Sequence, residues 1–518
     1  MFRLPLVAFC LFLTALAAFP ARAADAAKPN IIYILADDMG YGDVKALNKD
    51  CKIATPHLDR LAREGMIFTD AHSSSAVCTP TRYGILTGRY NWRTKLQNGV
   101  LGGYSRPLIA ADRLTVASFL KQHGYRTAAI GKWHLGMDWP LKDGNPADDK
   151  GDFAGGYGDA WKVDYTQPIQ NGPNDAGFDY YFGISASLDM PPYLFIRNRL
   201  VTAVPTLDRE LWPRRKGPSR EDFHLEDVLP AFASEAVKQI NEGAAEAKKG
   251  KPLFVYMPLN SPHTPIAPSK EWKGKSGIGS YGDFVMETDW AVGQVLEAID
   301  RNGLADNTLL IFTSDNGCSP QADFVALAKH GHNPSYLFRG YKADIFDGGH
   351  RIPFIARWPG KIAPGSISDQ TICLTDLMAT CAEIVAAKLP DTAGEDSVSL
   401  VPAFTGKATA PLHEAVVHHS INGSFSIRQG QWKLVLCADS GGWSAPRPGA
   451  KGANDQPAMQ LFDLSKDVGE ETNVMAAHPE VVDRLTKVLE RFVADGRSTP
   501  GVKQKNDVTV NIYRHVPK

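Results

Sequence analysis

The sequence lacks an excess of charge of either sign, because 56 lysine and arginine residues stand against 57 aspartate and glutamate residues. A chain with this balance lacks the basic surface that binds nucleic acids or anionic membranes, so recognition of an anion must depend on a local cluster of charges. Hydrophobic residues make up 43% and charged residues 22%, which excludes a disordered, collagen-like or polytopic membrane chain. The 518 residues suffice for roughly two to four domains, or for one large domain with insertions.

Cysteine is also scarce, with seven residues in the whole chain. Cys10 lies in the apolar N-terminal run, and the other six are Cys51, Cys78, Cys318, Cys373, Cys381 and Cys437. This number is too small for a disulfide-rich scaffold, and the pairing of the six cannot be deduced from their spacing. No CxxC pair or Cys/His cluster has the spacing of zinc ligands, so we expect no structural zinc site.

Long hydrophobic runs are missing everywhere except at the N-terminus. There, Arg3 precedes the apolar run from Leu4 to Phe19, and Ala21-Arg22-Ala23 fits the small-x-small rule for a cleavage site. We therefore expect residues 1–23 to be a signal peptide and the protein to be exported to the periplasm, secreted, or lysosomal in a eukaryote. No later segment reaches the roughly eighteen apolar residues of a membrane helix, so we expect no membrane span after cleavage.

Four short apolar runs, typical of buried parallel strands, each lead directly into polar residues. They are Ile31 to Ala36, Thr127 to Ile130, Leu253 to Met257 and Leu309 to Thr313. Segments with helical periodicity lie between them, which predicts an α/β fold with a large mixed, mostly parallel sheet flanked by helices. In such a fold the functional site lies beyond the carboxyl ends of the strands.

After about residue 405 the pattern changes to short runs separated by glycine-rich turns, followed by a helical stripe after Pro479. We therefore expect an α/β domain at residues 24–408. Residues 409–518 are expected to form a smaller α+β subdomain with a small antiparallel sheet and a terminal helix.

The segment from Cys78 to Arg82 is the most informative motif. Pro80 suits the first turn of a helix, which would place Cys78 at a helix N-terminus, where free amide groups favour an anion. A buried or disulfide-bonded cysteine is the alternative. Cys-x-Pro-x-Arg followed by Leu-Thr-Gly-Arg (residues 86–89) resembles the signature of the type I sulfatases of the alkaline phosphatase superfamily. The resemblance implies an alkaline phosphatase-like fold and oxidation of Cys78 to formylglycine by a formylglycine-generating enzyme.

Two polar pairs, Asp37-Asp38 and Asp315-Asn316, follow the first and last of the four apolar runs. Either pair alone could be a helix cap or a turn, but four oxygen donors together suit a hard divalent cation. The resemblance implies that these four residues and position 78 bind one metal ion. We expect Ca²⁺, with Mg²⁺ as the alternative.

Three further motifs resemble family signatures: Gly131 to Gly136, Ser261 to Pro265, and the segment before Gly348-Gly349. The catalytic residues that the resemblance implies are Cys78, Arg82, Lys132, His134, His263 and Lys342. A hydroxyl of hydrated formylglycine would attack sulfur, with Asp315 as an acceptor of its proton. His263, with Lys342, would protonate the leaving alcohol, and His134 would deprotonate the second hydroxyl to release sulfate. The two histidine roles could be exchanged. Arg82 would hold the hydroxyls and Lys132 a sulfate oxygen.

Some further groups are candidates for the substrate pocket. They are the loop from Asp189 to Tyr193 and the histidines His330, His332, His350, His418 and His419.

The resemblance implies an exported hydrolase of O-sulfate esters that acts on sulfated saccharides. The surroundings of Cys78 are similar to those of polysaccharide-degrading members that act on 6-O-sulfated galactose or N-acetylgalactosamine. One alternative is a phosphonate or phosphodiester hydrolase of the same superfamily, which can share the signature and the metal pair. A noncatalytic carbohydrate-binding homologue is the second alternative.

Overall fold

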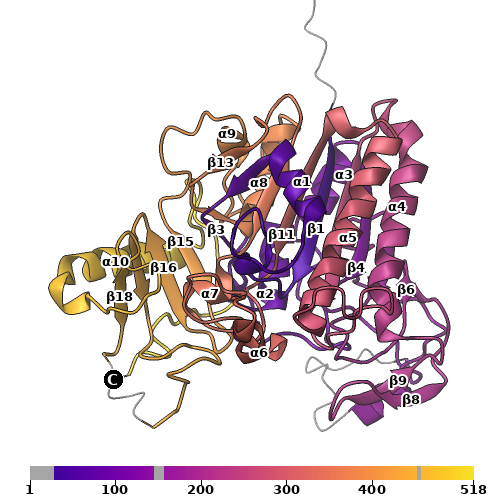
Figure 1. The fold of residues 1–518 in the computed structure, drawn as a ribbon, viewed down its shortest axis with the longest axis horizontal. Helices are drawn as coiled ribbons and strands as arrows, with labels where there is room; N and C mark the ends of the chain where they lie inside the picture. The colour runs from indigo at the N-terminus through magenta and orange to yellow at the C-terminus, as the bar shows by residue number, and fades with distance from the viewer. Residues whose placement is uncertain (1–27, 145–156, 452–456, 518) are drawn as a thin grey trace, which may run out of the picture.

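The computed structural model describes residues 28–144, 157–451 and 457–517, so the expected signal peptide lies outside the described residues. A ten-stranded sheet forms the centre of the molecule (Figure 1). Its order is β13 (Ser366–Ser368), β2 (Met66–Phe68), β12 (Phe354–Arg357), β11 (Thr308–Ser314), β1 (Asn30–Asp37), β10 (Leu253–Pro262), β4 (Arg126–Lys132), β5 (Tyr180–Ile184), β6 (Ile196–Arg197) and β7 (Leu200–Val201). The five central strands from β11 to β5 are parallel, and antiparallel pairings flank them.

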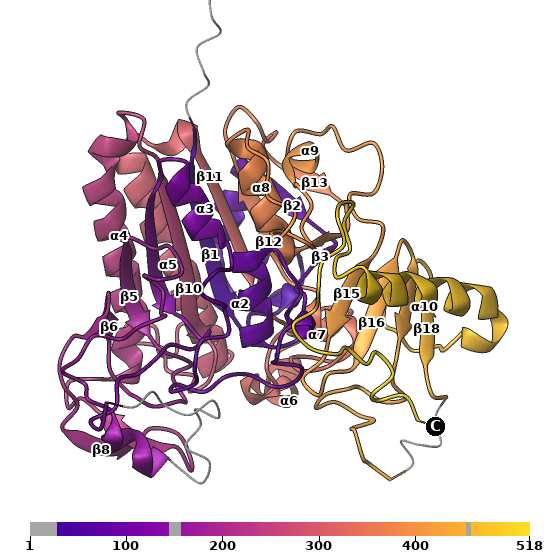
Figure 2. The ribbon, with the colours of Figure 1, turned by 180° about the vertical axis from the view of Figure 1, so that it is seen from behind.

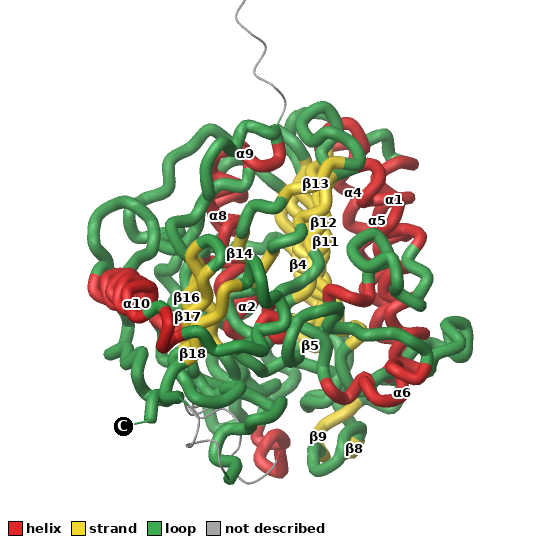
Figure 3. The backbone as a smooth tube through the Cα atoms, turned by 60° about the vertical axis from the view of Figure 1, so that its left-hand side comes forward, coloured by secondary structure: helices red, strands yellow, loops and turns green. Residues whose placement is uncertain are grey.

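Helices cover both faces of this sheet, as the turned view in Figure 3 shows. One face carries α1 (Pro56–Glu64), α4 (Val228–Ala247) and α5 (Ser280–Arg301). The other carries α2 (Cys78–Thr87), α3 (Val116–Gln122) and α8 (Leu377–Ile384). Alternate residues of β1 therefore enter different cores: Ile31 and Tyr33 join one cluster and Ile32 the other. A strand buried on both faces explains the continuous apolar run in the sequence.

A second sheet lies beside the large one, seen on the right in Figure 2. It is antiparallel, in the order β15 (Val416–His419), β16 (Phe425–Gln429), β17 (Trp432–Val435) and β18 (Gln460–Asp463). Helix α10 (Pro479–Ala494) packs on it through a buried stripe that includes Leu485 and Leu489. Both sheets confirm the expected fold class.

The remaining strands and α-helices are short. They are β3 (Ala71–His72) paired with β14 (Ile372–Cys373), the hairpin of β8 (Leu207–Glu210) and β9 (Lys216–Ser219), and the helices α6 (Phe324–Lys329), α7 (Asp347–His350) and α9 (Val401–Phe404). Among the described residues, no helix is both long and apolar enough to cross a membrane. All six described cysteines are unpaired and buried.

The small sheet is joined directly to the loop that precedes α2. A β-bridge pairs Ser75 with His419 at the end of β15, and the amide of Ala76 donates to the carbonyl of His419 at 2.9 Å. The C-terminal subdomain therefore contacts the chain two residues before Cys78.

Candidate active site

Cys78 is the first residue of α2, as Pro80 in the first turn predicts. Its side chain is buried, and its Sγ lies 3.7 Å from Oδ1 of Asp37. Burial raises the pKa of the thiol to about 12, against the opposing effect of Lys132 and Lys342. An unmodified Cys78 therefore stays protonated at neutral pH and is a weak nucleophile.

The two polar pairs meet because β1 and β11 are adjacent and parallel. The amide of Asp38 donates to Oδ1 of Asp315 at 3.2 Å, and Nδ2 of Asn316 donates to Oδ1 of Asp38 at 2.7 Å. Asp37 and these three residues are all buried. Asp38 also has a positive φ of 65°, an uncommon conformation for a non-glycine residue that is often found at functional sites.

Each of the three carboxylates has its own buried cation. Nζ of Lys132 lies 2.7 Å from Asp37, and Nζ of Lys342 lies 2.7 Å from Asp38. Nη2 of Arg82 lies 2.7 Å from Asp315. Nη2 of Arg82 also lies 3.5 Å from Oδ1 of Asp37. Because buried charges are costly unless they are paired, these pairings explain how six ionisable groups share one buried site.

The charges shift the pKa values of the acids in opposite directions. Burial alone would raise the pKa of Asp37, but Lys132, His263 and Arg82 hold it well below its usual range. Burial, and then repulsion from Asp37, raise the pKa of Asp315 to about 6. Burial disfavours charge on Lys342, but Asp38, Cys78 and Asp37 together outweigh it and raise the pKa of the lysine above its usual value.

His134 follows β4 and has a free ring nitrogen. It has a positive φ of 55°, and its amide donates to the carbonyl of Ser185 at 2.9 Å. Its Nε2 lies 2.7 Å from the carbonyl of Leu101, whereas its buried Nδ1 has no hydrogen-bond partner. Burial, and then Lys132, hold the pKa of His134 well below its ordinary value. The ring is therefore neutral, with Nε2 as the donor and Nδ1 as a free proton acceptor.

His263 follows the third apolar run, at the end of β10, and reaches the same cluster. Its Nε2 lies 3.6 Å from Oδ2 of Asp38, and its Nδ1 contacts the carbonyl of Thr264. Burial, followed by the charge of Lys342, lowers the pKa of His263. The structure thus brings together all ten residues named for the site from the sequence.

The donor set fits a hard divalent cation. Ligand atoms of Asp37, Asp38, Cys78 and His263 lie within 4.8 Å of one another. Oδ1 of Asn316 is buried without a hydrogen-bond partner, although its amide nitrogen donates to Asp38. A lone buried acceptor beside carboxylates is the arrangement expected of a ligand to Ca²⁺ or Mg²⁺, both of which prefer oxygen.

The additional histidines are placed differently. His332 pairs with Asp43 at 2.8 Å, and His330 is exposed. His350 and His418 stack at 3.9 Å in a separate buried cluster that also contains His72. Among the described residues, none of these histidines forms a hydrogen bond or an ion pair with Asp37, Asp38 or Asp315.

In the loop from Asp189 to Tyr193, which the sequence suggested for the substrate pocket, Tyr193 is buried in the core. Asp189 pairs with Arg215 at 2.7 Å and keeps a buried Oδ1 without a hydrogen-bond partner.

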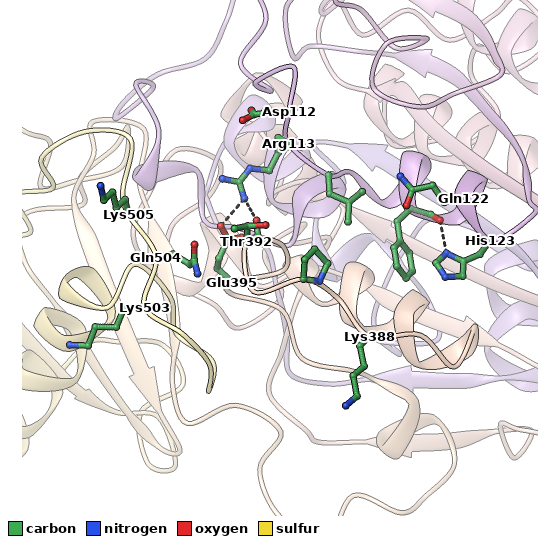
Figure 4. Close-up of a pocket in the computed structure, with 13 residues that line it drawn as sticks. Asp112, Arg113, Gln122, His123, Lys388, Thr392, Glu395, Lys503, Gln504 and Lys505 are labelled. Atoms are coloured by element: carbon green, nitrogen blue, oxygen red, sulfur yellow. Dashed lines mark hydrogen bonds and ion pairs between the residues drawn. The ribbon is translucent and has the colours of Figure 1, made fainter.

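A cavity of about 730 Å³ lies elsewhere, between α3 and the C-terminal segment (Figure 4). Its lining residues include Arg113, His123, Lys388 and Lys503, and none of the residues named for the active site. Arg113 is neutralised by Glu395 at 2.7 Å. The cavity is therefore separate from the acidic cluster, and the guanidinium group of Arg113 is already paired with Glu395.

Comparisons with known proteins agree with the motifs. The model of the sulfatase family matches residues 29–386. An N-acetylgalactosamine-6-O-sulfatase of Bacteroides thetaiotaomicron is 33% identical over 89% of this chain and 93% of that protein. Human arylsulfatase A is 32% identical over 94% of this chain and 92% of its own. A solved Bacteroides thetaiotaomicron structure, described in work on the metabolism of glycosaminoglycans, superposes with a TM-score of 0.77 at 32% identity, covering 90% of this chain and 99% of that one.

Proposed function

The chain belongs to the sulfatase family and is a sulfuric ester hydrolase, and we propose that it removes O-sulfate groups from sulfated saccharides. The similarity to an N-acetylgalactosamine-6-O-sulfatase over most of both chains supports a 6-O-sulfated N-acetylgalactosamine or galactose as the substrate. The observation that carries the proposal is the set of three buried cation–carboxylate pairs around Cys78. Such a set can hold one sulfate group and one divalent cation in a site without net charge of its own.

In the proposed reaction, formylglycine formed from Cys78 supplies the nucleophile. The raised thiol pKa supports this, because an unmodified cysteine here would be mostly protonated. Arg82, one helical turn after Cys78, holds the hydroxyls at that position, and Asp315 accepts the proton of the attacking hydroxyl. Lys132 holds a sulfonyl oxygen.

The two histidines take opposite proton-transfer roles in this proposal. The free Nδ1 of His134 accepts a proton from the second hydroxyl at position 78 as sulfate leaves. His263, together with Lys342, protonates the leaving alcohol oxygen. The exchanged assignment remains the alternative to be tested by mutation.

The proposed metal site consists of Asp37, Asp38, Asp315, Asn316 and the modified residue 78. These residues would hold Ca²⁺, with Mg²⁺ as the alternative. When bound, the cation would neutralise charge on sulfonyl oxygens.

The proposal also includes export. Residues 1–23 would act as the signal peptide, and a formylglycine-generating enzyme would act on Cys78 during maturation. The mature chain would then comprise a catalytic domain at residues 24–408 and a subdomain at residues 409–518.

Two measurements test the proposal. The first compares kcat/KM for 4-nitrophenyl sulfate with that for a 4-nitrophenyl phosphodiester, and then for saccharides sulfated at O6. Faster phosphodiester cleavage would support the phosphodiesterase alternative, and no turnover at all would support a carbohydrate-binding homologue. The second is mass spectrometry of the Cys78 peptide from the native host, where an unmodified thiol in active enzyme would exclude the formylglycine nucleophile.

A further inference from the structure

Of the ten residues named for the site, His263 and Lys342 have the most exposed side chains. His263 and Lys342 are each 6% exposed and Thr264 is 8% exposed, whereas Asp37 and Asp315 are at 0%. When the sulfate group of a substrate is bound in the site, we therefore expect the rest of the substrate to extend past these side chains.

A loop of the C-terminal subdomain packs against the segment that carries Lys342. Buried Asp344 accepts hydrogen bonds from the amides of Tyr341 at 3.0 Å, Trp443 at 2.7 Å and Ser444 at 3.0 Å. The hydroxyl of Tyr341 also donates to the carbonyl of Trp443 at 3.2 Å. Asp344 thus fixes the loop of residues 441–444 to the residues on either side of Lys342.

Gly442 shows how closely this loop approaches. A Cβ atom at this position would lie 2.5 Å from the backbone carbonyl of Ala343, the residue after Lys342. A side chain there would collide with the backbone, so glycine is needed for the close approach. The backbone of the loop therefore rests on the segment that carries the lysine.

Trp443 is half-buried on this loop, and both of its backbone groups are held. Among the described residues, no aromatic ring stacks on its indole, and its ring N–H has no protein acceptor. By contrast, Trp432 of the same subdomain packs on His478 with ring centroids 4.8 Å apart. A partly exposed tryptophan on a loop held by backbone hydrogen bonds offers an apolar surface near a polar site, an arrangement common in ligand recognition.

We propose that Trp443 is a specificity-determining residue that stacks against the apolar face of the substrate's pyranose ring. This inference rests on the proposed saccharide function. A 6-O-sulfate is separated from its ring by a methylene group, and in this proposal the ring extends from the sulfate past Lys342 toward residues 441–444. An aryl ring bonded directly to the ester oxygen stays nearer to Lys342.

The test compares Trp443→Ala with wild type through one quantity, the ratio of kcat/KM for a 6-O-sulfated saccharide to kcat/KM for 4-nitrophenyl sulfate. We expect this ratio to fall about tenfold, chiefly through KM, as the loss of one stacking contact implies. Trp443→Phe, which keeps an aromatic ring, should keep most of the wild-type ratio. Trp432→Ala, a matched change at the start of β17 where the ring packs on His478, should leave the ratio at the wild-type value.

A second measurement does not depend on turnover of the saccharide. The desulfated saccharide should inhibit aryl sulfate hydrolysis, and Trp443→Ala should raise its inhibition constant by a similar factor. If wild type cleaves sulfated saccharides but the alanine variant keeps the ratio and the inhibition constant, the stacking role is wrong and the proposed function stands. If wild type cleaves aryl sulfates and no sulfated saccharide, both the stacking role of Trp443 and the proposed saccharide function are wrong.

Discussion

Arg82 places two guanidinium nitrogens on one oxygen of Asp315, with Nη2 at 2.7 Å and Nε at 3.1 Å. Its third nitrogen, Nη1, donates to the carbonyl of Lys132 at 3.1 Å. Because Arg82 lies one helical turn after Cys78, the guanidinium connects the helix that begins at Cys78 with the ends of β11 and β4. All of these contacts are buried.

Arg82→Lys keeps the charge but cannot reproduce this set of contacts. We expect kcat to fall at least about tenfold, because an ammonium group is a point charge without the planar fork of a guanidinium. Arg82→Ala should also lower the free energy of unfolding by about 3–5 kcal/mol, because it leaves Asp315 buried without its partner. Steady-state kinetics and urea denaturation measure the two effects. Arg60→Lys, at a half-exposed ion pair, is the control, and unchanged kcat in Arg82→Lys would contradict the prediction.

Removal of the metal should lower both activity and thermal stability. A ligand that binds only the folded chain stabilises it by about 2.7 kcal/mol at one hundred times its Kd, so Tm should fall in a chelator and recover with added Ca²⁺. Asn316→Ala removes the unpartnered Oδ1 and should shift the recovery to higher Ca²⁺ concentration. Asn302→Ala, at the end of α5, is the matched control. Full activity and an unchanged Tm after exhaustive chelation would contradict the metal site.

The central strands and the position of the site could be predicted from the sequence. β1 and β11 are buried on both faces, so each appears as an unbroken apolar run, and their parallel pairing brings Asp37 and Asp315 to one edge of the sheet. Which cation pairs with which acid could not be predicted. Lys132 reaches Asp37 across β10, which lies between β4 and β1, and strand order is not encoded in local pattern.

The additional histidines show a second limit. His72 and His350 are 278 residues apart in sequence, yet their Nδ1 atoms lie 3.0 Å apart. Their approach depends on how the segment of α7 packs against β3 and the small sheet, and no spacing between them signals it. The loop at Trp443 is similar, because only the packing of the two sheets brings a residue of the C-terminal subdomain beside Lys342.

Replacement of His134 should slow the chemical step more than it weakens binding. His134→Gln removes the free Nδ1 acceptor, and general base catalysis typically contributes about 10²–10⁴-fold, so we expect kcat to fall within that range. KM should change much less, since the ring makes no ion pair in the site. His330→Gln, at an exposed histidine, provides the control. A variant that raised KM and kept kcat would assign His134 to binding instead.

Stability should fall as the pH drops below about 6.5, and His419 should account for part of this loss. Burial, and then the charge of Arg514, lower the pKa of His419 to about 3. The unfolded chain, whose histidine pKa is about 6.5, therefore binds a proton that the folded chain excludes. The contribution of His419 is complete above about pH 6.5 and declines by about 1.4 kcal/mol per pH unit between that value and about pH 3. His419→Gln should reduce the slope by this amount in urea denaturation at pH 7, 6 and 5, whereas His330→Gln should not. An unchanged slope in His419→Gln would mean that the imidazole is not held neutral in the folded chain.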